Sequence, residues 1–126
     1  MRIGQRAGRP DGTLRGMQVV SSDDTRFDAD VAEVRRELVV VYFRGPGCPN
    51  CDFFATRLPT LINALEGQPV RLVKFDAYAA PALATRFAVA GIPRFDLWRD
   101  GKRLGRMSEF HSDDYWLSVV REHLPA

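Results

Sequence analysis

The order of apolar and polar residues divides the first third of the chain into a strand, a helix and a second strand. Residues 17–20 form a short strand-like run, and residues 25–36 repeat apolar side chains at helical spacing, beginning with Phe27. Residues 38–43 read Leu-Val-Val-Val-Tyr-Phe, a continuous apolar and β-branched run that is typical of a strand buried on both faces. We therefore expect residues 38–43 to form the centre of a sheet.

The rest of the chain continues this alternation. The Gly-Pro-Gly at 45–47 ends the buried strand, and a helix is expected over residues 49–66 with a kink at Pro59, which lacks a backbone donor. The later predicted elements are a strand at 70–77, a short helix at 81–87, a hairpin of strands 92–98 and 102–107 that turns at Asp100-Gly101, and a final helix at 112–124. Helices that link the first strands imply parallel pairing, and the hairpin adds an antiparallel edge, so the sequence predicts an α/β fold with a mixed sheet.

Composition and charge are those of one globular domain. The chain has 126 residues, 45% of them hydrophobic, and a net charge of +2. We expect residues 17–126 to form the domain and residues 1–16, with four Arg among four Gly, to be a flexible basic arm that buries too little to offset its ordering entropy.

The small net charge argues against nucleic acid or a membrane as partner, and no stretch approaches the ~20 apolar residues of a bilayer span. No signal-peptide-like segment follows the first ten residues, so we expect a cytoplasmic protein.

The only two cysteines, Cys48 and Cys51, stand where the buried strand ends and the next helix begins. Cytosolic disulfides are usually transient and catalytic, so this pair favours chemistry over a structural staple. The free N–H groups and the dipole of a helix N-terminus favour an anion and lower a cysteine pKa from ~8.5 to about 3.5–7.5. Cys48 is the predicted nucleophile, Cys51 one turn later is placed to resolve the mixed disulfide, and Pro49 fits the first helical position.

The same cysteine spacing also occurs in zinc and iron–sulfur sites. Such a site needs four ligands, and the remaining candidates in this chain are His111 and His123, near its C-terminal end. Two molecules sharing a cluster through their cysteine pairs is the other metal alternative. We predict no metal and no cofactor, only a redox-active disulfide between Cys48 and Cys51.

Five segments carry a resemblance that goes beyond the cysteine spacing. They are Met17-Gln18-Val19-Val20, Phe27-Asp28-Ala29-Asp30-Val31, Val39-Val40-Val41-Tyr42-Phe43 with the CxxC after it, Gly91-Ile92-Pro93, and the Asp100-Gly101 turn. From Met17 to Leu124 the chain resembles the thioredoxin family. The resemblance implies a thioredoxin-like three-layer α/β/α fold, with a central mixed sheet of about five strands flanked by about four helices. It also implies a thiol–disulfide oxidoreductase that reduces or exchanges protein disulfides.

The resemblance assigns roles around the cysteine pair. The family proline that matches Pro93 is cis and faces the cysteines, and the backbone before it, here Gly91 and Ile92, pairs with the substrate chain as an added strand. A plain turn before a strand is the alternative for Pro93. Lys74 matches a lysine that influences the buried active-site charge in many bacterial members, or it is a strand lysine whose ammonium reaches solvent.

Several positions around the site depart from the family pattern. They are Tyr42 for a buried aspartate, Arg44 and Gly47 for tryptophans, Pro49-Asn50 for Gly-Pro, Arg94 for a threonine, and Glu109 for a glycine of the substrate groove. Without the aspartate, deprotonation of Cys51 would depend on Lys74 or water, because Tyr42 is a poor base. Glu109 would narrow or recharge the groove to which Gly47 also belongs.

The arginines give a prediction about the redox couple. Where Arg44 and Arg94 line the pocket, they would stabilise the Cys48 thiolate and thus the reduced form, so we predict a reduction potential above the about −270 mV of thioredoxin. The alternative for each is a solvent-facing side chain at a strand end. Asp96, inside an apolar strand, is costly alone, so it either pairs with a nearby arginine or marks an exposed sheet face.

Three functions are compatible with these residues. A reductase of protein disulfides would take electrons from thioredoxin reductase or glutathione. A glutaredoxin, which Gly47-Cys48-Pro49-Asn50-Cys51 also resembles, uses glutathione, but the chain lacks a Gly-Gly-Asp-like stretch after the proline strand. A thioredoxin-like interaction module with vestigial cysteines is the third. We expect the first of these, acting as a monomer.

Overall fold

The computed structural model describes residues 16–126, so residues 1–15 of the predicted basic arm lie outside the described residues. The elements in chain order are β1 (Gln18–Ser21), η2 (Asp28–Ala32), β2 (Leu38–Arg44), α1 (Pro49–Ala64), β3 (Val70–Asp76), α2 (Pro81–Arg86), β4 (Arg94–Arg99), β5 (Lys102–Met107) and α3 (Asp113–Glu122). Their order is the predicted β-α-β-α-β-α-β-β-α.

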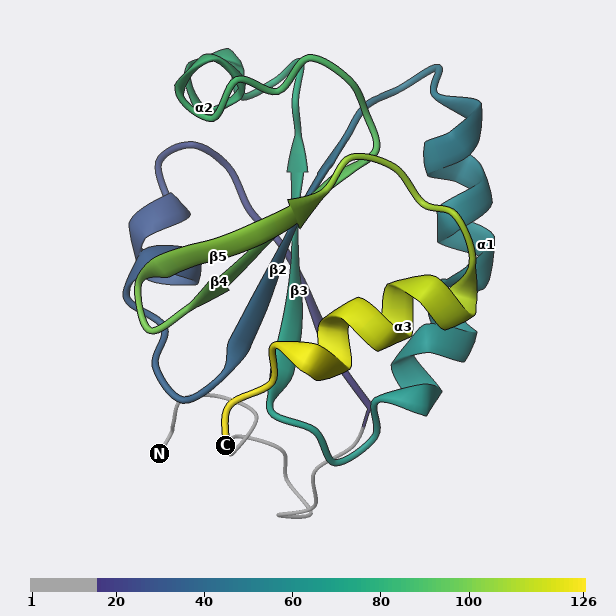
Figure 1. Ribbon diagram of the computed structural model, residues 1–126. Coiled ribbons are helices and arrows are strands. Elements are labelled where there is room, and N and C mark those ends of the chain that lie inside the picture. The colour runs from purple at the N-terminus through teal and green to yellow at the C-terminus, as the bar shows by residue number, and fades with distance from the viewer. Residues whose placement is uncertain (1–15) are drawn as a thin grey trace.

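The five strands form one mixed sheet in the order β1-β3-β2-β4-β5 (Figure 1). Strands β1, β3 and β2 are parallel, β4 runs antiparallel to β2, and β5 runs antiparallel to β4. Residues 38–43 of β2 are all buried, which confirms that this apolar run is the central strand. With helices on both faces, this is the predicted thioredoxin-like α/β fold.

The two faces of β2 enter two separate cores because successive side chains of a strand point to opposite sides. Leu38, Val40 and Tyr42 pack toward α1 and α3, whereas Val39, Val41 and Phe43 pack toward η2 and α2. Figure 1 shows α1 and α3 on one side of the sheet and α2 on the other. Cys48 and Cys51 lie at the start of α1, which covers the first of these two sides.

The predicted helix at residues 25–36 is much shorter in the structure. It is one π-helical turn, Asp28–Ala32, whose Asp30 carboxylate accepts hydrogen bonds from Ser22 Oγ (2.6 Å) and Arg26 Nη2 (3.1 Å). Arg36 then takes a left-handed φ of 66°, and its N–H donates to Asp100 Oδ1 at 3.0 Å. The helix thus ends at Ala32, before the end of its apolar pattern, and the Arg36 contact joins the segment before β2 to the β4–β5 turn.

An ion pair joins α1 to α3 at the surface. Arg57 Nε donates to both carboxylate oxygens of Asp113 at 3.1 Å. Hydrogen bonding to Arg57 is the main reason that the pKa of Asp113 is lowered, and hydrogen bonding to Asp113 is the main reason that the pKa of Arg57 is raised. Helix α1 itself continues through Pro59 to Ala64, two residues short of the predicted end at 66.

Candidate active site

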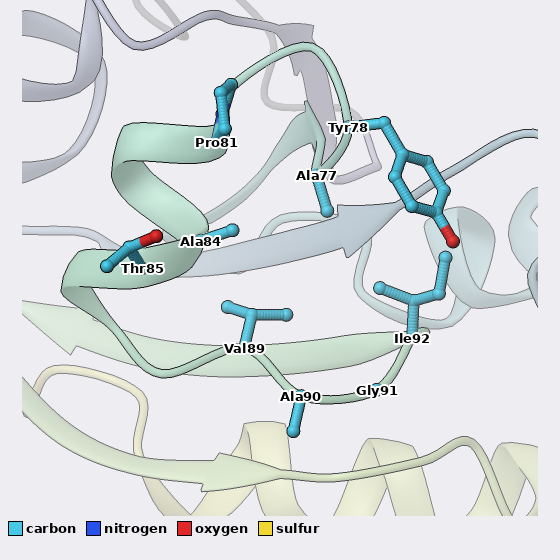
Figure 2. Close-up of a pocket in the computed structure, with 9 residues that line it drawn as sticks. All are labelled: Ala77, Tyr78, Pro81, Ala84, Thr85, Val89, Ala90, Gly91 and Ile92. Carbon is cyan, nitrogen blue, oxygen red and sulfur yellow. The ribbon is translucent and has the colours of Figure 1, made fainter.

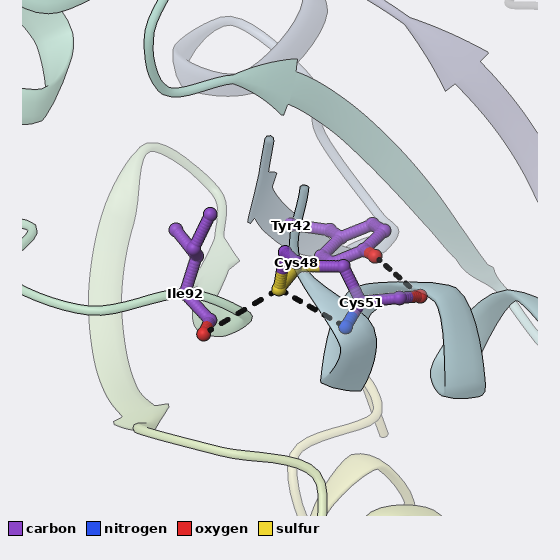
Figure 3. The surroundings of a disulfide bond; sticks show 4 residues. All are labelled: Tyr42, Cys48, Cys51 and Ile92. Atoms are coloured by element: carbon purple, nitrogen blue, oxygen red, sulfur yellow. Dashed lines mark hydrogen bonds between the residues drawn. A yellow bond between two sulfur atoms is a disulfide. The ribbon is translucent and has the colours of Figure 1, made fainter. Parts of the chain in front are cut away.

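Cys48 and Cys51 form a disulfide at the N-terminus of α1, with their Cα atoms 5.2 Å apart (Figure 3). Cys48 is the N-cap residue: its Sγ accepts a hydrogen bond from the Cys51 N–H at 3.1 Å. A sulfur held there by a backbone donor is placed where negative charge is favoured. Cys48 retains 8% of its surface and Cys51 only 2%, so the first sulfur is the more accessible of the two.

The loop before β4 faces this disulfide. The Ile92–Pro93 peptide bond is cis, as the resemblance implied, and the Ile92 carbonyl oxygen lies 3.8 Å from Cys48 Sγ. Figure 3 shows that oxygen directed at the sulfur from the opposite side of the site to Cys51. A backbone carbonyl beside the more accessible sulfur is a position from which an extended chain can be held by main-chain hydrogen bonds.

Tyr42 occupies the floor of the site, where the family pattern has an aspartate. The residue is 97% buried, and its ring lies 4.9 Å from the Phe54 ring and 5.1 Å from the Phe95 ring. Its hydroxyl donates to the Cys51 carbonyl at 3.5 Å. Burial raises the pKa of Tyr42 to about 12, with Arg44 opposing the rise. The hydroxyl is therefore protonated at neutral pH and fills the space of a carboxylate without its charge.

Lys74 and Arg44 lie on the same sheet face as Tyr42. Lys74 is directly opposite Tyr42 in the parallel register of β2 and β3, and Arg44 follows two residues after Tyr42, opposite Asp76. Both side chains are half-buried. The fold thus brings together the two cations that the sequence assigned to this region, on the side of the sheet that α1 covers.

Arg94 is not a solvent-facing side chain at a strand end. It is 97% buried, and its Nε and Nη2 donate to Asp96 Oδ1 and Oδ2 at 2.8 and 3.0 Å. The predicted pairing of Asp96 with a nearby arginine is confirmed, and the alternative of an exposed sheet face is wrong, because Asp96 is only 1% exposed. The charge of Arg94 is balanced by Asp96, so of the two arginines Arg44 is left as the main support for a raised reduction potential.

Among the remaining predicted residues, Gly47, Pro49 and Asn50 flank Cys48 in the chain, and Glu109 lies two residues after the end of β5. Gly47 has a φ of +69°, which favours glycine, and nothing lies within 4 Å of the point where its Cβ would stand. Pro49 and Asn50 form the exposed first turn of α1. Glu109 is exposed, with its Oε1 4.0 Å from His111 Nδ1. The substrate-binding roles of Gly47 and Glu109 and the supporting roles of Pro49 and Asn50 stay predictions.

A cavity of about 300 Å³ adjoins Ile92 and was not foreseen from the sequence. Figure 2 shows it between α2 and the loop before β4, with Tyr78, Val89 and Ile92 at its walls. Tyr78 is 69% exposed, yet its ring lies over Gly45, where a Cβ would come within 2.6 Å of Cε2. No periodicity marks Tyr78, because only the tertiary contact with a glycine from another segment places it beside the site.

The two histidines proposed as alternative metal ligands have other partners. Within residues 16–126, no group of three or more His, Cys, Asp or Glu side chains is placed to hold a metal ion. His111 packs edge-on against the Tyr115 ring at 5.2 Å, and His123 Nδ1 lies 2.7 Å from the Val119 carbonyl oxygen.

Among residues 16–126, no helix has the length and apolar character needed to cross a membrane.

The fold and this site together define a thioredoxin-like domain with a disulfide at the start of its first long helix. A family model described as Thioredoxin matches residues 18–122, almost the whole of the described chain. The chain belongs to the thioredoxin family.

The individual relatives include proteins named protein disulfide-isomerase, thioredoxin and glutaredoxin. Protein disulfide-isomerase A4 of Homo sapiens is 33% identical over 86 residues, 67% of this chain and 13% of that protein. Thioredoxin of Staphylococcus saprophyticus is 25% identical over 108 residues, 86% of this chain and 100% of that protein. Glutaredoxin 3 of Danio rerio is 25% identical over 96 residues, 76% of this chain and 29% of that protein. The chain therefore spans only a small part of the isomerase and glutaredoxin relatives.

Proposed function

We propose that this protein is a thiol–disulfide oxidoreductase that reduces or exchanges disulfides of other proteins through Cys48 and Cys51. The observation that carries the proposal is the placement of Cys48 Sγ. This sulfur receives the N–H of Cys51 at 3.1 Å and faces the Ile92 carbonyl at 3.8 Å, at the first turn of α1. The Cys51 N–H and the helix N-terminus thus favour negative charge on one side of the sulfur, and the Ile92 carbonyl on the other side can pair with an extended substrate chain.

The proposed reaction has two exchange steps. In the reduced protein, the Cys48 thiolate attacks one sulfur of a substrate disulfide, so a mixed disulfide forms and the second substrate sulfur leaves as a thiolate. Cys51, deprotonated by Lys74 or by water, then attacks the Cys48 sulfur and releases the first substrate sulfur. The substrate gains two electrons and the protein loses two, which leaves the Cys48–Cys51 disulfide seen in the structure.

Proton transfer from Cys51 is the step in which this site differs most from the family pattern. Tyr42 stays protonated at neutral pH and cannot accept that proton. Lys74 stands opposite Tyr42 on the same face and, when deprotonated, is a nearby side chain able to do so. We infer that resolution of the mixed disulfide is slower than in members that carry the aspartate.

Insulin reduction tests the proposal and identifies the electron donor. Thioredoxin reductase with NADPH is one donor, and glutathione with its reductase is the other. Activity only with the first supports a thioredoxin-like role, and activity only with the second supports the glutaredoxin-like alternative that the glutaredoxin relatives keep open. Inactivity with both, or activity that survives Cys48→Ser, contradicts the proposal and leaves an interaction module.

A matched pair of variants tests the two cysteine roles. Cys51→Ser should accumulate a mixed disulfide with the substrate, because the attacking sulfur remains while the resolving one is lost. Cys48→Ser should accumulate none. Mass spectrometry under non-reducing conditions counts the adducts, and equal adduct levels in the two variants would contradict the assignment.

We further propose that the protein acts as a monomer in the cytoplasm and that its reduction potential lies above the about −270 mV of thioredoxin. Arg44 supports the second point, because its side chain lies on the sheet face beneath α1 and lacks a carboxylate partner within 4 Å among residues 16–126. A glutathione redox titration that returned a potential equal to or more negative than that of thioredoxin would refute the proposed reduction potential.

A further inference from the structure

The loop that presents Ile92 is irregular, and the buried side chain of Arg94 hydrogen-bonds to its first part. The loop leaves α2 at Phe87 and reaches β4 at Arg94, whose backbone is opposite Phe43 in the register of β2 and β4. The Arg94 guanidinium turns back along the loop, and its Nη1 donates to the Ala88 carbonyl at 2.9 Å. Arg94 therefore connects the beginning and the end of the segment that contains Ile92.

Ala88 is an unfavourable residue for the conformation that it adopts. Its φ is +52°, in the left-handed region where non-glycine residues are uncommon and need support from their surroundings. The Ala88 N–H donates to the Thr85 carbonyl at 3.1 Å, the Val89 N–H donates to the Ala84 carbonyl at 2.8 Å, and Arg94 binds the Ala88 carbonyl. Loss of Arg94 would remove a hydrogen bond that links this turn to the sheet, and would leave only apolar packing of Phe87 and Val89 there.

Asp96 determines where the guanidinium points. The two carboxylate oxygens of Asp96 accept hydrogen bonds from Nε and Nη2 of Arg94, which leaves Nη1 to donate to the Ala88 carbonyl. The planar guanidinium thus binds Asp96 through one edge and Ala88 through another. Asp96 Oδ2 also lies 3.5 Å from Nη1 of Arg103, whose side chain is 40% exposed. Stability alone explains such a pair poorly, because apolar residues of similar size usually stabilise a core as well as a buried ion pair does.

We propose that Arg94, oriented by Asp96, is a positioning residue that holds the Ile92 backbone in the geometry needed to pair with the substrate chain. This inference rests on the proposed function. It predicts a selective defect: substrates that must pair with Ile92 are affected, whereas small disulfides that only need the Cys48 sulfur are not. Arg94 does not itself touch the reacting sulfurs.

The test uses a variant that should stay folded. Arg94→Met combined with Asp96→Leu removes both charges together, so no buried charge is left alone, and it removes the link to Ala88. Arg94→Lys keeps the charge but not the planar fork. Arg103→Gln is the matched control, because it removes a contact with Asp96 and leaves Arg94 bound to Ala88.

Kinetics of two substrates and NMR of the loop give the readouts. For the double variant, we expect KM for insulin to rise about tenfold, the rate with the small aromatic disulfide DTNB to stay within about twofold, and the amide order parameters of residues 90–92 to fall. Arg94→Lys should be intermediate, and Arg103→Gln should match the wild type. If the double variant does not fold, Arg94→Lys carries the same comparison.

Three results would overturn the inference: an unchanged KM for insulin, unchanged order parameters at residues 90–92, or equal losses with insulin and DTNB. If the wild-type protein does not reduce insulin, the proposed function fails instead. The order parameters then decide the role of Arg94 in holding the loop, since that measurement does not depend on activity.

Discussion

Reduction of the Cys48–Cys51 disulfide should lower the free energy of unfolding by about 1 kcal/mol. The cysteines are three positions apart, so the disulfide closes a loop of four residues. In the chain-entropy model, closing a loop of that size raises the free energy of the unfolded chain by about 1.9 kcal/mol. A Cys48 thiolate at the start of α1 offsets about 0.3–1 kcal/mol of this difference in the reduced protein, because the helix N-terminus favours negative charge. The oxidised form should remain the more stable one.

Urea unfolding measures this difference directly. Trp116 and Trp98 are both buried, so their fluorescence reports unfolding of each core, and the oxidised protein is compared with protein held in a phosphine reductant at pH 7. The melting temperature should also fall by roughly 4–6 °C on reduction. A difference of about 1 kcal/mol corresponds to roughly 20 mV between the folded pair and the same pair in the unfolded chain.

The control is the double variant Cys48→Ser with Cys51→Ser, whose unfolding must not respond to the reductant. The reasoning is refuted if the reduced protein is more stable than the oxidised one. Stabilisation of the thiolate would then exceed the loop entropy, and the protein would favour oxidation of its partners. Measurement of this sign therefore also bears on the direction in which electrons flow.

Three further predictions concern single side chains. The lowered pKa of Asp113 contributes stability that is present above about pH 4 and is lost as the pH falls through that pKa. Asp113→Asn should remove this contribution, so the free energy of unfolding of the variant, measured in urea, should depend less on pH below about 4 than that of the wild type. Phe54→Ala should cost about 3–5 kcal/mol of unfolding free energy, because the ring is fully buried among four aromatic rings, and a loss under about 1 kcal/mol would contradict this. Tyr42→Phe should change the unfolding free energy by less than about 1 kcal/mol, since the 3.5 Å hydrogen bond of the hydroxyl is weak. It should also leave the pH profile of insulin reduction unchanged, whereas loss of the basic limb would show that the hydroxyl transfers a proton in the reaction.

Several parts of the site could be read from the sequence because they depend on local pattern. The β-branched run at 38–43 predicts a buried strand wherever it is found, and Gly-Pro-Gly followed by Cys-Pro predicts where that strand ends and α1 begins. The helix at 25–36 was overestimated for the opposite reason. Its apolar spacing is real, but the helix is one turn that ends at Ala32, and the segment after it is held by a contact of the left-handed Arg36 with Asp100, 64 residues away.

The charged residues near the site depended on tertiary structure. Asp96 and Arg94 are two positions apart on a strand, which puts them on the same face, but the sequence does not say whether that face is covered. Only the packed fold shows both side chains buried and the guanidinium directed at Ala88. The same holds for Tyr78, whose place over Gly45 joins two segments that are distant in the chain.

The sequence by itself determined the type of chemistry, and the tertiary structure decided how the site is supported. The helix-start position of Cys48 depends only on its neighbours in the chain, so local rules were sufficient for it. The partners of Arg94, the floor formed by Tyr42 and the cavity beside Ile92 each join residues from different elements. Such contacts depend on which faces meet in the folded chain, and periodicity alone does not contain that information.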